Sequence, residues 1–243
     1  MSDVLKLEED KGIARITINR PAKDNMLTLE MLDNVSALII DAGCEPSVRA
    51  ISVSSTGDDF CLGRDPLSSP EHTPKDGLEM REALAAPILG FYEAVRGAEV
   101  PVVATVQGRA FGFGCAAAAV CDVTIAAHNA SFSLPEMNHN LPPTAAISAH
   151  IDRTMPKSVA WLVYSNEEIT AETALLAGFV SHVVQRSELE KTSERVLKTI
   201  ASRNRAALAT CKSYLNNARL METPQASDLA ANMLALVMSS RAD

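Results

Sequence analysis

A strand, a glycine-rich turn and a helix of very small side chains follow one another in the middle of the chain, and this pattern restricts the fold more than any other. The apolar residues 102–106 fit a buried strand, and Gly108, Gly112 and Gly114 let the backbone turn sharply after it. Residues 116–120 are four alanines and a valine, small enough for a helix to lie close against a sheet. The first N–H groups of such a helix have no partner within it, so they can stabilise a negative charge in front of them.

Two common motifs overlap this turn, and the neighbouring residues argue against both. The letters GFGCAA, which begin at Gly112, fit the dinucleotide-binding pattern G-x-G-x-x-A. The next strand, however, ends in alanine, histidine and asparagine instead of the acid that would hold a ribose. The letters GRAFG have the glycine spacing of a nucleophile elbow, but Ala110 stands where the nucleophile would be. A dinucleotide-binding enzyme and a serine hydrolase are therefore disfavoured.

Several segments around the turn follow one another in an order typical of one family. ITINRPAKDNMLTLEMLDNV (16–35), DDFCLGRD (58–65), SFSLPE (131–136) and EEITAETALLAGFVSHVV (167–184) lie before and after it. With the turn, they make the chain resemble the crotonase, or enoyl-CoA hydratase/isomerase, superfamily over nearly its whole length. The resemblance implies an α/β fold, the crotonase-like spiral of ββα units with a helical C-terminal region.

The resemblance also implies chemistry on an acyl-CoA thioester, with coenzyme A as part of the substrate and no separate cofactor. Two backbone N–H groups would bind the thioester oxygen as it becomes an enolate. By position these are the amides of Arg64, in CLGRD, and of Phe113, in GFG. The family usually has glycine at the second position, so the Phe113 side chain would narrow the pocket, and its backbone would be strained if it needed a positive φ.

Glu136 is the side chain that the resemblance assigns to proton transfer, because it follows Pro135 in SFSLPE. A carboxylate beside an apolar acyl pocket has its pKa raised by desolvation, toward the pH at which proton transfer is efficient. Glu136 would remove a proton from the carbon next to the thioester carbonyl.

Ala116 is the main departure from the family, since hydratases usually carry a second glutamate there. Hydration needs two acid/base groups, whereas one carboxylate can move a proton between two carbons. The sequence therefore favours double-bond isomerisation of an enoyl-CoA by Glu136 alone. A hydratase with a second acid from elsewhere, for example Glu79, Glu82 or Glu93, and a catalytically weak acyl-CoA-binding protein remain alternatives, as do thioester hydrolysis and decarboxylation.

The resemblance gives a further set of residues that would contact the substrate, and it gives no metal site. Lys23 is the nearest cation to the family's phosphate-binding loop, and CoA needs local positive charge. His139 follows Glu136 closely, and Asn140 stands where glycine is frequent, in keeping with the tolerance of asparagine for left-handed backbone. The complete set of expected substrate-binding residues is Lys23, Cys61, Leu62, Asp65, Gly112, Gly114 and His139.

Composition limits the cellular setting and the partners of the chain. The net charge of −8 argues against general nucleic-acid binding. No apolar run reaches membrane-spanning length, and the first residues are too charged for a signal peptide, so we expect a cytoplasmic protein without a membrane partner. Five cysteines without a C-x-x-C pair indicate neither a disulfide framework nor a zinc site, and Cys115 is expected to be a buried thiol.

The remaining pattern divides the chain into a core, residues 1–186, and a C-terminal helical region, residues 187–243. An apolar stripe within residues 226–239 is too large to leave in water, and the resemblance implies a homotrimer or a dimer of trimers. Residues 65–77 are rich in proline and serine and are predicted to form a mobile loop. Strands are expected near Leu5 and at 13–19, 50–54, 102–106, 123–126 and 180–184.

Overall fold

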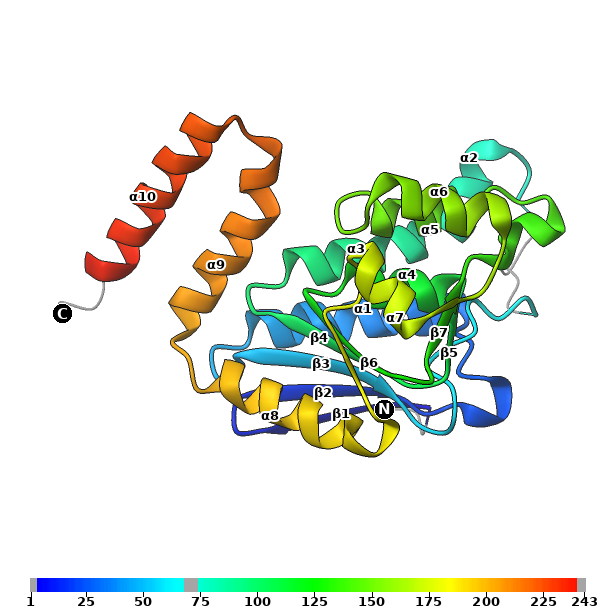
Figure 1. Cartoon of the computed structure of the whole chain (residues 1–243), viewed down its shortest axis with the longest axis horizontal. Helices are drawn as coiled ribbons and strands as arrows, with labels where there is room; N and C mark the ends of the chain where they lie inside the picture. The colour runs from blue at the N-terminus through cyan, green and yellow to red at the C-terminus, as the bar shows by residue number, and fades with distance from the viewer. Residues whose placement is uncertain (1–3, 68–73, 240–243) are drawn as a thin grey trace.

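The computed structural model describes residues 4–67 and 74–239, which form two sheets and the helices around them (Figure 1). The larger sheet has six strands in the spatial order β1, β2, β3, β4, β6 and β9. β1 pairs antiparallel with β2, and the later neighbours are all parallel. The bounds of these strands are β1 (Leu5–Asp10), β2 (Ile13–Ile18), β3 (Ala50–Ser55), β4 (Val102–Val106), β6 (Val123–Ala127) and β9 (His182–Val184).

Helices cover both faces of this sheet (Figure 1). α1 (Leu29–Cys44) and α3 (Ala86–Gly97) pack against each other on one face, and α8 (Leu189–Ala201) lies on the other. α1 begins where the Thr28 hydroxyl accepts the Met31 N–H at 3.1 Å. It buries Leu32, Val35 and Ile39, an i, i+3, i+7 stripe. The sheet is therefore shielded from water on both sides, as parallel sheets usually are.

A second sheet of three short strands, β5 (Arg109–Phe111), β7 (Ser131–Ser133) and β8 (Ile169–Thr170), follows the ends of β4 and β6 in the chain. β5 pairs parallel with β7, and β7 pairs antiparallel with β8. β5 lies inside the segment that the sequence predicted as a continuous turn, and that prediction was incomplete. The glycines on either side of β5 allow two sharp changes of direction with a short strand between them.

The other helices lie at the ends of the strands and along the C-terminal part of the chain. They are α2 (Gly77–Met80), α4 (Phe113–Val120), α5 (Thr144–His150), α6 (Pro156–Ser165), α7 (Ala171–Ala177), α9 (Arg205–Asn217) and α10 (Thr223–Ser239). α4 begins before Ala116, where the sequence placed its start, because the Ala116 N–H already bonds to the Gly112 carbonyl at 3.1 Å. No helix in the described part of the chain is long and apolar enough to cross a membrane.

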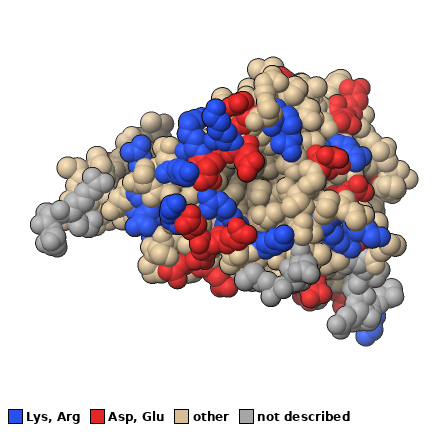
Figure 2. All heavy atoms as spheres, turned by 90° about the horizontal axis from the view of Figure 1, so that it is seen from below, with Lys and Arg blue, Asp and Glu red and all other residues tan. Residues whose placement is uncertain are grey.

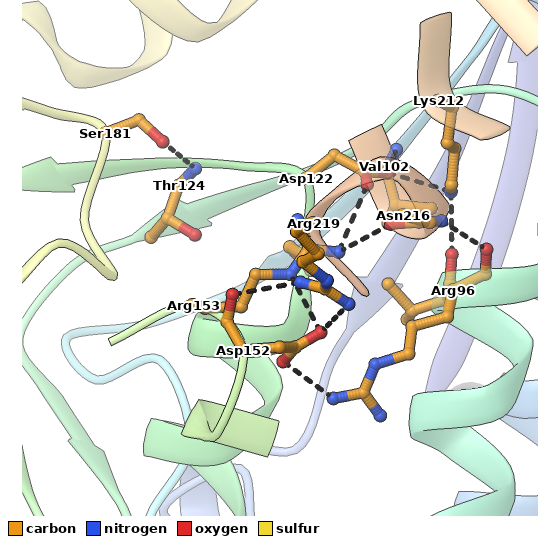
Figure 3. Close-up of polar contacts among 12 residues, drawn as sticks. Arg96, Val102, Asp122, Thr124, Asp152, Arg153, Ser181, Lys212, Asn216 and Arg219 are labelled. Atoms are coloured by element: carbon orange, nitrogen blue, oxygen red, sulfur yellow. Dashed lines mark hydrogen bonds and ion pairs between the residues drawn. The ribbon is translucent and has the colours of Figure 1, made fainter. Parts of the chain in front are cut away.

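Buried ion pairs hold α9 on the core (Figure 3). Lys212 is 5% exposed, and its ammonium group donates to the carbonyls of Val95 at 2.7 Å and Val100 at 3.0 Å. The same group lies 2.8 Å from the Asp122 carboxylate. Desolvation lowers the pKa of Lys212, and the carboxylate opposes that shift. α9 is thus fixed to the turn between α4 and β6 by groups that are costly to separate.

A second carboxylate extends this network. Asp152 bonds to the Arg96 guanidinium at 3.1 Å and also pairs with Arg219, which follows α9. Arg153 lies 3.6 Å from Asp122 and so joins the two halves of the network. α10, in contrast, extends away from both sheets (Figure 1).

Most expected elements are confirmed. The strands at 13–18, 50–55, 102–106 and 123–127 agree with the sequence prediction to within one residue at each end. The last strand begins at His182 instead of residue 180, because the N–H groups of Phe179 and Val180 close the end of α7 on the Ala174 carbonyl. The predicted mobility of loop 65–77 falls largely on residues 68–73, which lie outside the described residues. The division at residue 186 stays a prediction; α8 packs on the core sheet.

Removal of the buried ammonium group is predicted to destabilise the protein. Lys212→Met keeps the aliphatic stem but deprives Asp122 of its closest cation, so we expect the free energy of unfolding to fall by about 3 kcal/mol. Urea unfolding followed by circular dichroism measures this change. Lys198→Met is the control, because Lys198 pairs with Glu194 at 3.2 Å on the surface, and it should change stability by less than about 0.5 kcal/mol. Equal effects of the two substitutions would contradict the interpretation.

Candidate active site

Two loops that are far apart in the sequence are brought into contact beside the small sheet. The Phe111 N–H bonds to the Cys61 carbonyl at 2.9 Å, and Cys61 and Ala110 form a parallel bridge. A Cβ added to Gly114 would lie 2.0 Å from the Cys61 carbonyl oxygen, a distance that no other residue tolerates. The loop after β3 and the start of α4 therefore pack backbone to backbone.

The backbone of Arg64 is oriented by a second bridge. The Leu27 N–H bonds to the Gly63 carbonyl at 3.0 Å, and the Asp65 N–H bonds to the Leu27 carbonyl at 2.8 Å. In a parallel bridge of this kind the middle residue of the pair, here Arg64, directs its own N–H to the other side. A Cβ added to Gly63 would lie 3.8 Å from the Phe113 nitrogen, so the start of α4 lies beside the residue before Arg64.

Phe113 is the first residue of α4, so its N–H belongs to the positive end of that helix. The positive φ, 51°, falls on Gly112 and not on Phe113, so the strain considered for phenylalanine does not arise. The Phe113 side chain is 5% exposed and packs on the rings of Phe91 at 5.2 Å and Tyr92 at 6.2 Å. Its ring is therefore a core aromatic.

Glu136 lies directly over the glycine turn. It belongs to the 3-10 helix Pro135–His139, which follows β7. This helix ends at Asn140, which has the expected left-handed conformation with φ 55°. A Cβ added to Gly112 would lie 3.1 Å from Glu136 Oε1, so the carboxyl group sits against the backbone one residue before Phe113. Desolvation raises the pKa of Glu136. Glu136 Oε2 is buried and has no hydrogen-bond partner among the described residues.

Tyr92, on α3, is a member of this site that the sequence did not reveal. It is 1% exposed, and its hydroxyl is another buried polar atom for which the described residues offer no partner. Burial raises the pKa of the Tyr92 hydroxyl, electrostatic interactions with Cys115 and Glu136 raise it further, and the Arg96 guanidinium opposes the shift. In the sequence Tyr92 is one aromatic residue on the apolar face of a helix, and only the helix packing shows where its hydroxyl lies.

Cys115 and His150 form a neutral pair behind the turn. The thiol lies 3.7 Å from His150 Nε2, and His150 Nδ1 lies 3.0 Å from the Thr154 hydroxyl. Burial raises the pKa of Cys115 and lowers that of His150 to about 4. Both groups are therefore uncharged near neutral pH, and the fully buried Cys115 is the inert thiol that was expected.

The remaining expected residues are more dispersed. Asp65 is buried, and its carboxylate is engaged by the Arg20 guanidinium at 2.8 Å, which holds the pKa of Asp65 below its usual range. Lys23 and His139 are exposed, and Leu62 is half-buried with its N–H on the Asp24 carbonyl at 3.1 Å. The structure brings together Cys61, Arg64, Gly112, Phe113, Gly114 and Glu136. Substrate binding by Lys23, Cys61, Leu62, Asp65, Gly112, Gly114 and His139 stays a prediction, as do the catalytic roles of Glu136, Arg64 and Phe113.

The three glutamates that the sequence offered as a second acid have other surroundings. Glu82 and Glu93 are exposed, and Glu79 accepts the Lys75 N–H at 2.8 Å at the start of α2. These residues form a solvated face. Within the described ranges, no cluster of three His, Cys, Asp or Glu side chains is arranged to hold a metal ion.

A polar cavity of about 320 Å³ on the α8 side of the large sheet is a weaker candidate for the site. Its polar groups bind one another: Thr105 lies 3.0 Å from Ser193, and Arg15 lies 2.8 Å from Glu194. Figure 2 shows the outer surface on this side, where Lys and Arg are mixed with Asp and Glu. The polar groups named here are paired with one another, whereas Glu136 Oε2 has no hydrogen-bond partner among the described residues.

Comparisons with known proteins agree with the geometry. The family model described as "Enoyl-CoA hydratase/isomerase" matches residues 8–242. Enoyl-CoA hydratase domain-containing protein 3, mitochondrial, of Rattus norvegicus is 31% identical over 84% of this chain and 67% of its own length. Crotonyl-CoA hydratase of Syntrophomonas wolfei is 28% identical over 97% of this chain and 90% of its own. An enoyl-CoA hydratase structure from Mycobacterium smegmatis superposes with a TM-score of 0.91 at 26% identity, covering 98% of this chain and 91% of the other.

The fold and the site define an enzyme of the crotonase type, a mixed α/β core with a helical C-terminal region. The chain belongs to the enoyl-CoA hydratase/isomerase family. The rat relative is named as mitochondrial, so the cytoplasmic location expected for this chain stays a prediction.

Proposed function

We propose that the protein isomerises the double bond of an enoyl-CoA, with Glu136 as the single acid/base and the amides of Arg64 and Phe113 as donors to the thioester oxygen. The observation that carries this proposal is the position of Glu136. Its carboxyl group lies against Gly112, one residue before the Phe113 amide, with one buried oxygen that no described residue binds. The proposed base, the Glu136 carboxylate, thus lies against the residue that precedes the proposed N–H donor, Phe113.

The chemistry follows from these two groups. A proton on the carbon next to a thioester carbonyl is removed more easily when the resulting enolate oxygen accepts hydrogen bonds, and each such donor is worth about 3 to 4 kcal/mol. The raised pKa of Glu136 makes its carboxylate a better base and its carboxylic acid able to return the proton near neutral pH. Return of the proton to C4 instead of C2 moves the double bond.

Ala116 supports isomerisation over hydration. The side chain is fully buried and carries no acid/base group. The pKa of the buried Tyr92 hydroxyl is raised, so this hydroxyl stays protonated and does not activate water as a base. The described part of the site contains one carboxylate, and one carboxylate suffices for proton transfer between carbons.

Two other functions follow from other observations. The names of the relatives favour hydration, with a second acid from residues outside those discussed. Alanine at position 116, where hydratases of the family usually carry a second glutamate, favours a catalytically weak acyl-CoA-binding protein. Separate reactions with a 3-enoyl-CoA and a 2-enoyl-CoA distinguish these three functions. Isomerisation of the 3-enoyl-CoA increases the absorbance of the conjugated thioester at constant mass, hydration of the 2-enoyl-CoA adds one water, and a binding protein changes neither compound.

The substrate and the assembly are the remaining parts of the proposal. Lys23 is the exposed cation proposed to contact CoA phosphates, since Arg109 is neutralised by Asp59 at 2.6 Å. We also propose a homotrimer or a dimer of trimers in the cytoplasm. α10 supports assembly, because none of its described residues is buried and its Leu236 is 69% exposed.

Substitution of the proposed base should abolish turnover without harming the fold. Glu136→Gln is expected to lower kcat for 3-enoyl-CoA by at least about a hundredfold, because a positioned acid/base contributes that much or more. Absorbance of the conjugated product measures the rate. The variant should unfold at the same or a higher urea concentration at neutral pH, since it removes a desolvated carboxylate. Glu93→Gln, at an exposed position, is the control; a Glu136→Gln enzyme with full activity would rule out the mechanism.

The pH profile should report the same carboxyl group. Glu136 must be ionised to take the proton, so kcat/KM rises with pH through its pKa. Because desolvation raises that pKa, the midpoint of the acid limb should lie above the ordinary value for glutamate, about 4.3. Initial rates with 3-enoyl-CoA between about pH 4 and 8 measure this midpoint. A midpoint at or below the ordinary value would show that the catalytic group is not desolvated.

The proposed assembly predicts a mass three or six times that of one chain in light scattering. Leu234 and Leu236 are 60% and 69% exposed on α10, and replacing both with aspartate should shift the mass toward the monomer. Leu176→Asp is the control, because Leu176 is 76% exposed on α7. A monomeric wild-type protein would contradict the proposal.

A further inference from the structure

One nitrogen of the Arg20 side chain joins two segments of the chain at the edge of the proposed site. Arg20 Nη1 donates to the Met26 carbonyl at 2.7 Å and to the Asp65 carboxylate at 2.8 Å. Met26 precedes Leu27 and Asp65 follows Arg64, and Leu27 and Arg64 form the parallel bridge described above. The guanidinium group therefore connects the two segments next to the residue whose amide is a proposed donor.

The bridge that orients this amide is short. It consists of the Leu27 N–H on the Gly63 carbonyl at 3.0 Å and the Asp65 N–H on the Leu27 carbonyl at 2.8 Å. It is isolated from the named strands, so no neighbouring strand extends it. The direction of the Arg64 N–H thus depends on how firmly the two segments are held together. A displacement of about 1 Å in a catalytic group can cost about a hundredfold in rate.

Arg20 itself projects from a fixed turn. Its backbone N–H donates to Asn25 Oδ1 at 2.9 Å, and the Asn25 N–H donates to the Arg20 carbonyl at 3.0 Å. Asn25 is 1% exposed, and its Nδ2 donates to the carbonyls of Thr56 and Asp59, both at 2.8 Å. The turn is therefore fixed to the loop after β3, and the Arg20 side chain starts from a defined position.

The carboxylate of Asp65 is engaged on both oxygens by groups of the protein. Oδ2 accepts from Arg20, and Oδ1 accepts the Leu67 N–H at 3.0 Å. The exposed fractions of the two side chains are 20% for Arg20 and 8% for Asp65. The bond from Arg20 and that from Leu67 lower the pKa of Asp65, so the carboxylate stays charged and the pair stays intact near neutral pH.

We infer that the Arg20–Asp65 pair positions the Arg64 amide for its bond to the thioester oxygen. The inference rests on the proposed function, and it makes Arg20 and Asp65 positioning residues that act through the Leu27–Arg64 bridge. A donor stabilises an enolate only if its N–H already points to the place where the charge develops. Loss of the pair should therefore weaken binding of the enolate more than binding of the neutral thioester.

The enolate of acetoacetyl-CoA provides a direct measure of the donors, because it is stable in water and absorbs in the near ultraviolet. The probe is titrated with base while bound to Glu136→Gln, in which no carboxylate at position 136 exchanges the proton. Two N–H donors favour the enolate, so we expect the pKa of the bound probe to lie at least about one unit below that of the free probe.

Substitutions of the pair are then added to Glu136→Gln. Arg20→Met combined with Asp65→Asn removes both charges, so the net charge is unchanged and no buried charge is left uncompensated. The pKa of the bound probe should rise by about one unit, a tenfold lower ratio of enolate to neutral probe. Affinity for butyryl-CoA, a saturated ligand, should stay within about threefold. Asp65→Glu keeps both charges but moves the carboxylate by one methylene, and it should raise the pKa of the probe by a smaller amount.

A second ion pair of the same length is the control. Arg15, on β2, lies 2.8 Å from Glu194, on α8, and the exposed fractions of these side chains are 25% and 36%. Arg15→Met combined with Glu194→Gln should leave the pKa of the bound probe unchanged. With Glu136 present, loss of the Arg20–Asp65 pair should lower kcat for 3-enoyl-CoA about tenfold or more with little change in KM, whereas the control should keep both values.

The outcomes are distinguishable. An unchanged pKa of the probe in the Arg20–Asp65 double variant or in Asp65→Glu, or an equal change in the control, overturns the inference and leaves the proposed function intact. A wild-type protein that does not isomerise 3-enoyl-CoA, although Glu136→Gln lowers the pKa of the probe, overturns the proposed reaction alone. An unshifted pKa of the probe bound to Glu136→Gln overturns the proposed donors and the inference with them.

Discussion

The contact between the Gly114 backbone and the Cys61 carbonyl is the constraint on which the rest of the site depends. A Cβ at position 114 would lie 2.0 Å from that oxygen, so the close approach exists only because glycine stands there. The approach brings the backbone around Arg64 beside the first turn of α4. Without this approach, the loop after β3 and the start of α4 would not lie against each other.

The chain treats buried polar groups in two opposite ways. Around α9, Lys212, Asp122 and Asp152 are engaged from several sides, although Arg153 Nε in the same network has no hydrogen-bond partner among the described residues. Beside the glycine turn, Tyr92 and Glu136 each keep a buried oxygen for which the described residues have no partner. The first arrangement fixes a helix in position, whereas the second leaves two buried oxygens unpaired at a cost in stability.

Local signals made much of this fold predictable. Apolar runs gave the strand at 102–106, and the tolerance of asparagine for a positive φ gave the conformation of Asn140, because both depend on residues adjacent in the sequence. The strand β5 was missed since three residues between glycines carry no periodic pattern. The position of the Tyr92 hydroxyl depends on how α3 packs on α4, a contact between segments that no local pattern encodes. Glu136 was identified as a candidate only because the segment SFSLPE resembles that of a known family.

The attachment of α10 has a consequence for how this sequence can change over time. α10 contacts mainly α9 and the short turn Ala218–Leu220 between them, and it contributes no buried side chain among its described residues. Substitutions in α10 are thus scarcely constrained by the sheets or by the site proposed around Glu136. The residues of α10 are therefore constrained mainly by whatever surface this helix packs against. The last helix can change to fit a different partner surface while the two sheets and the proposed site stay the same.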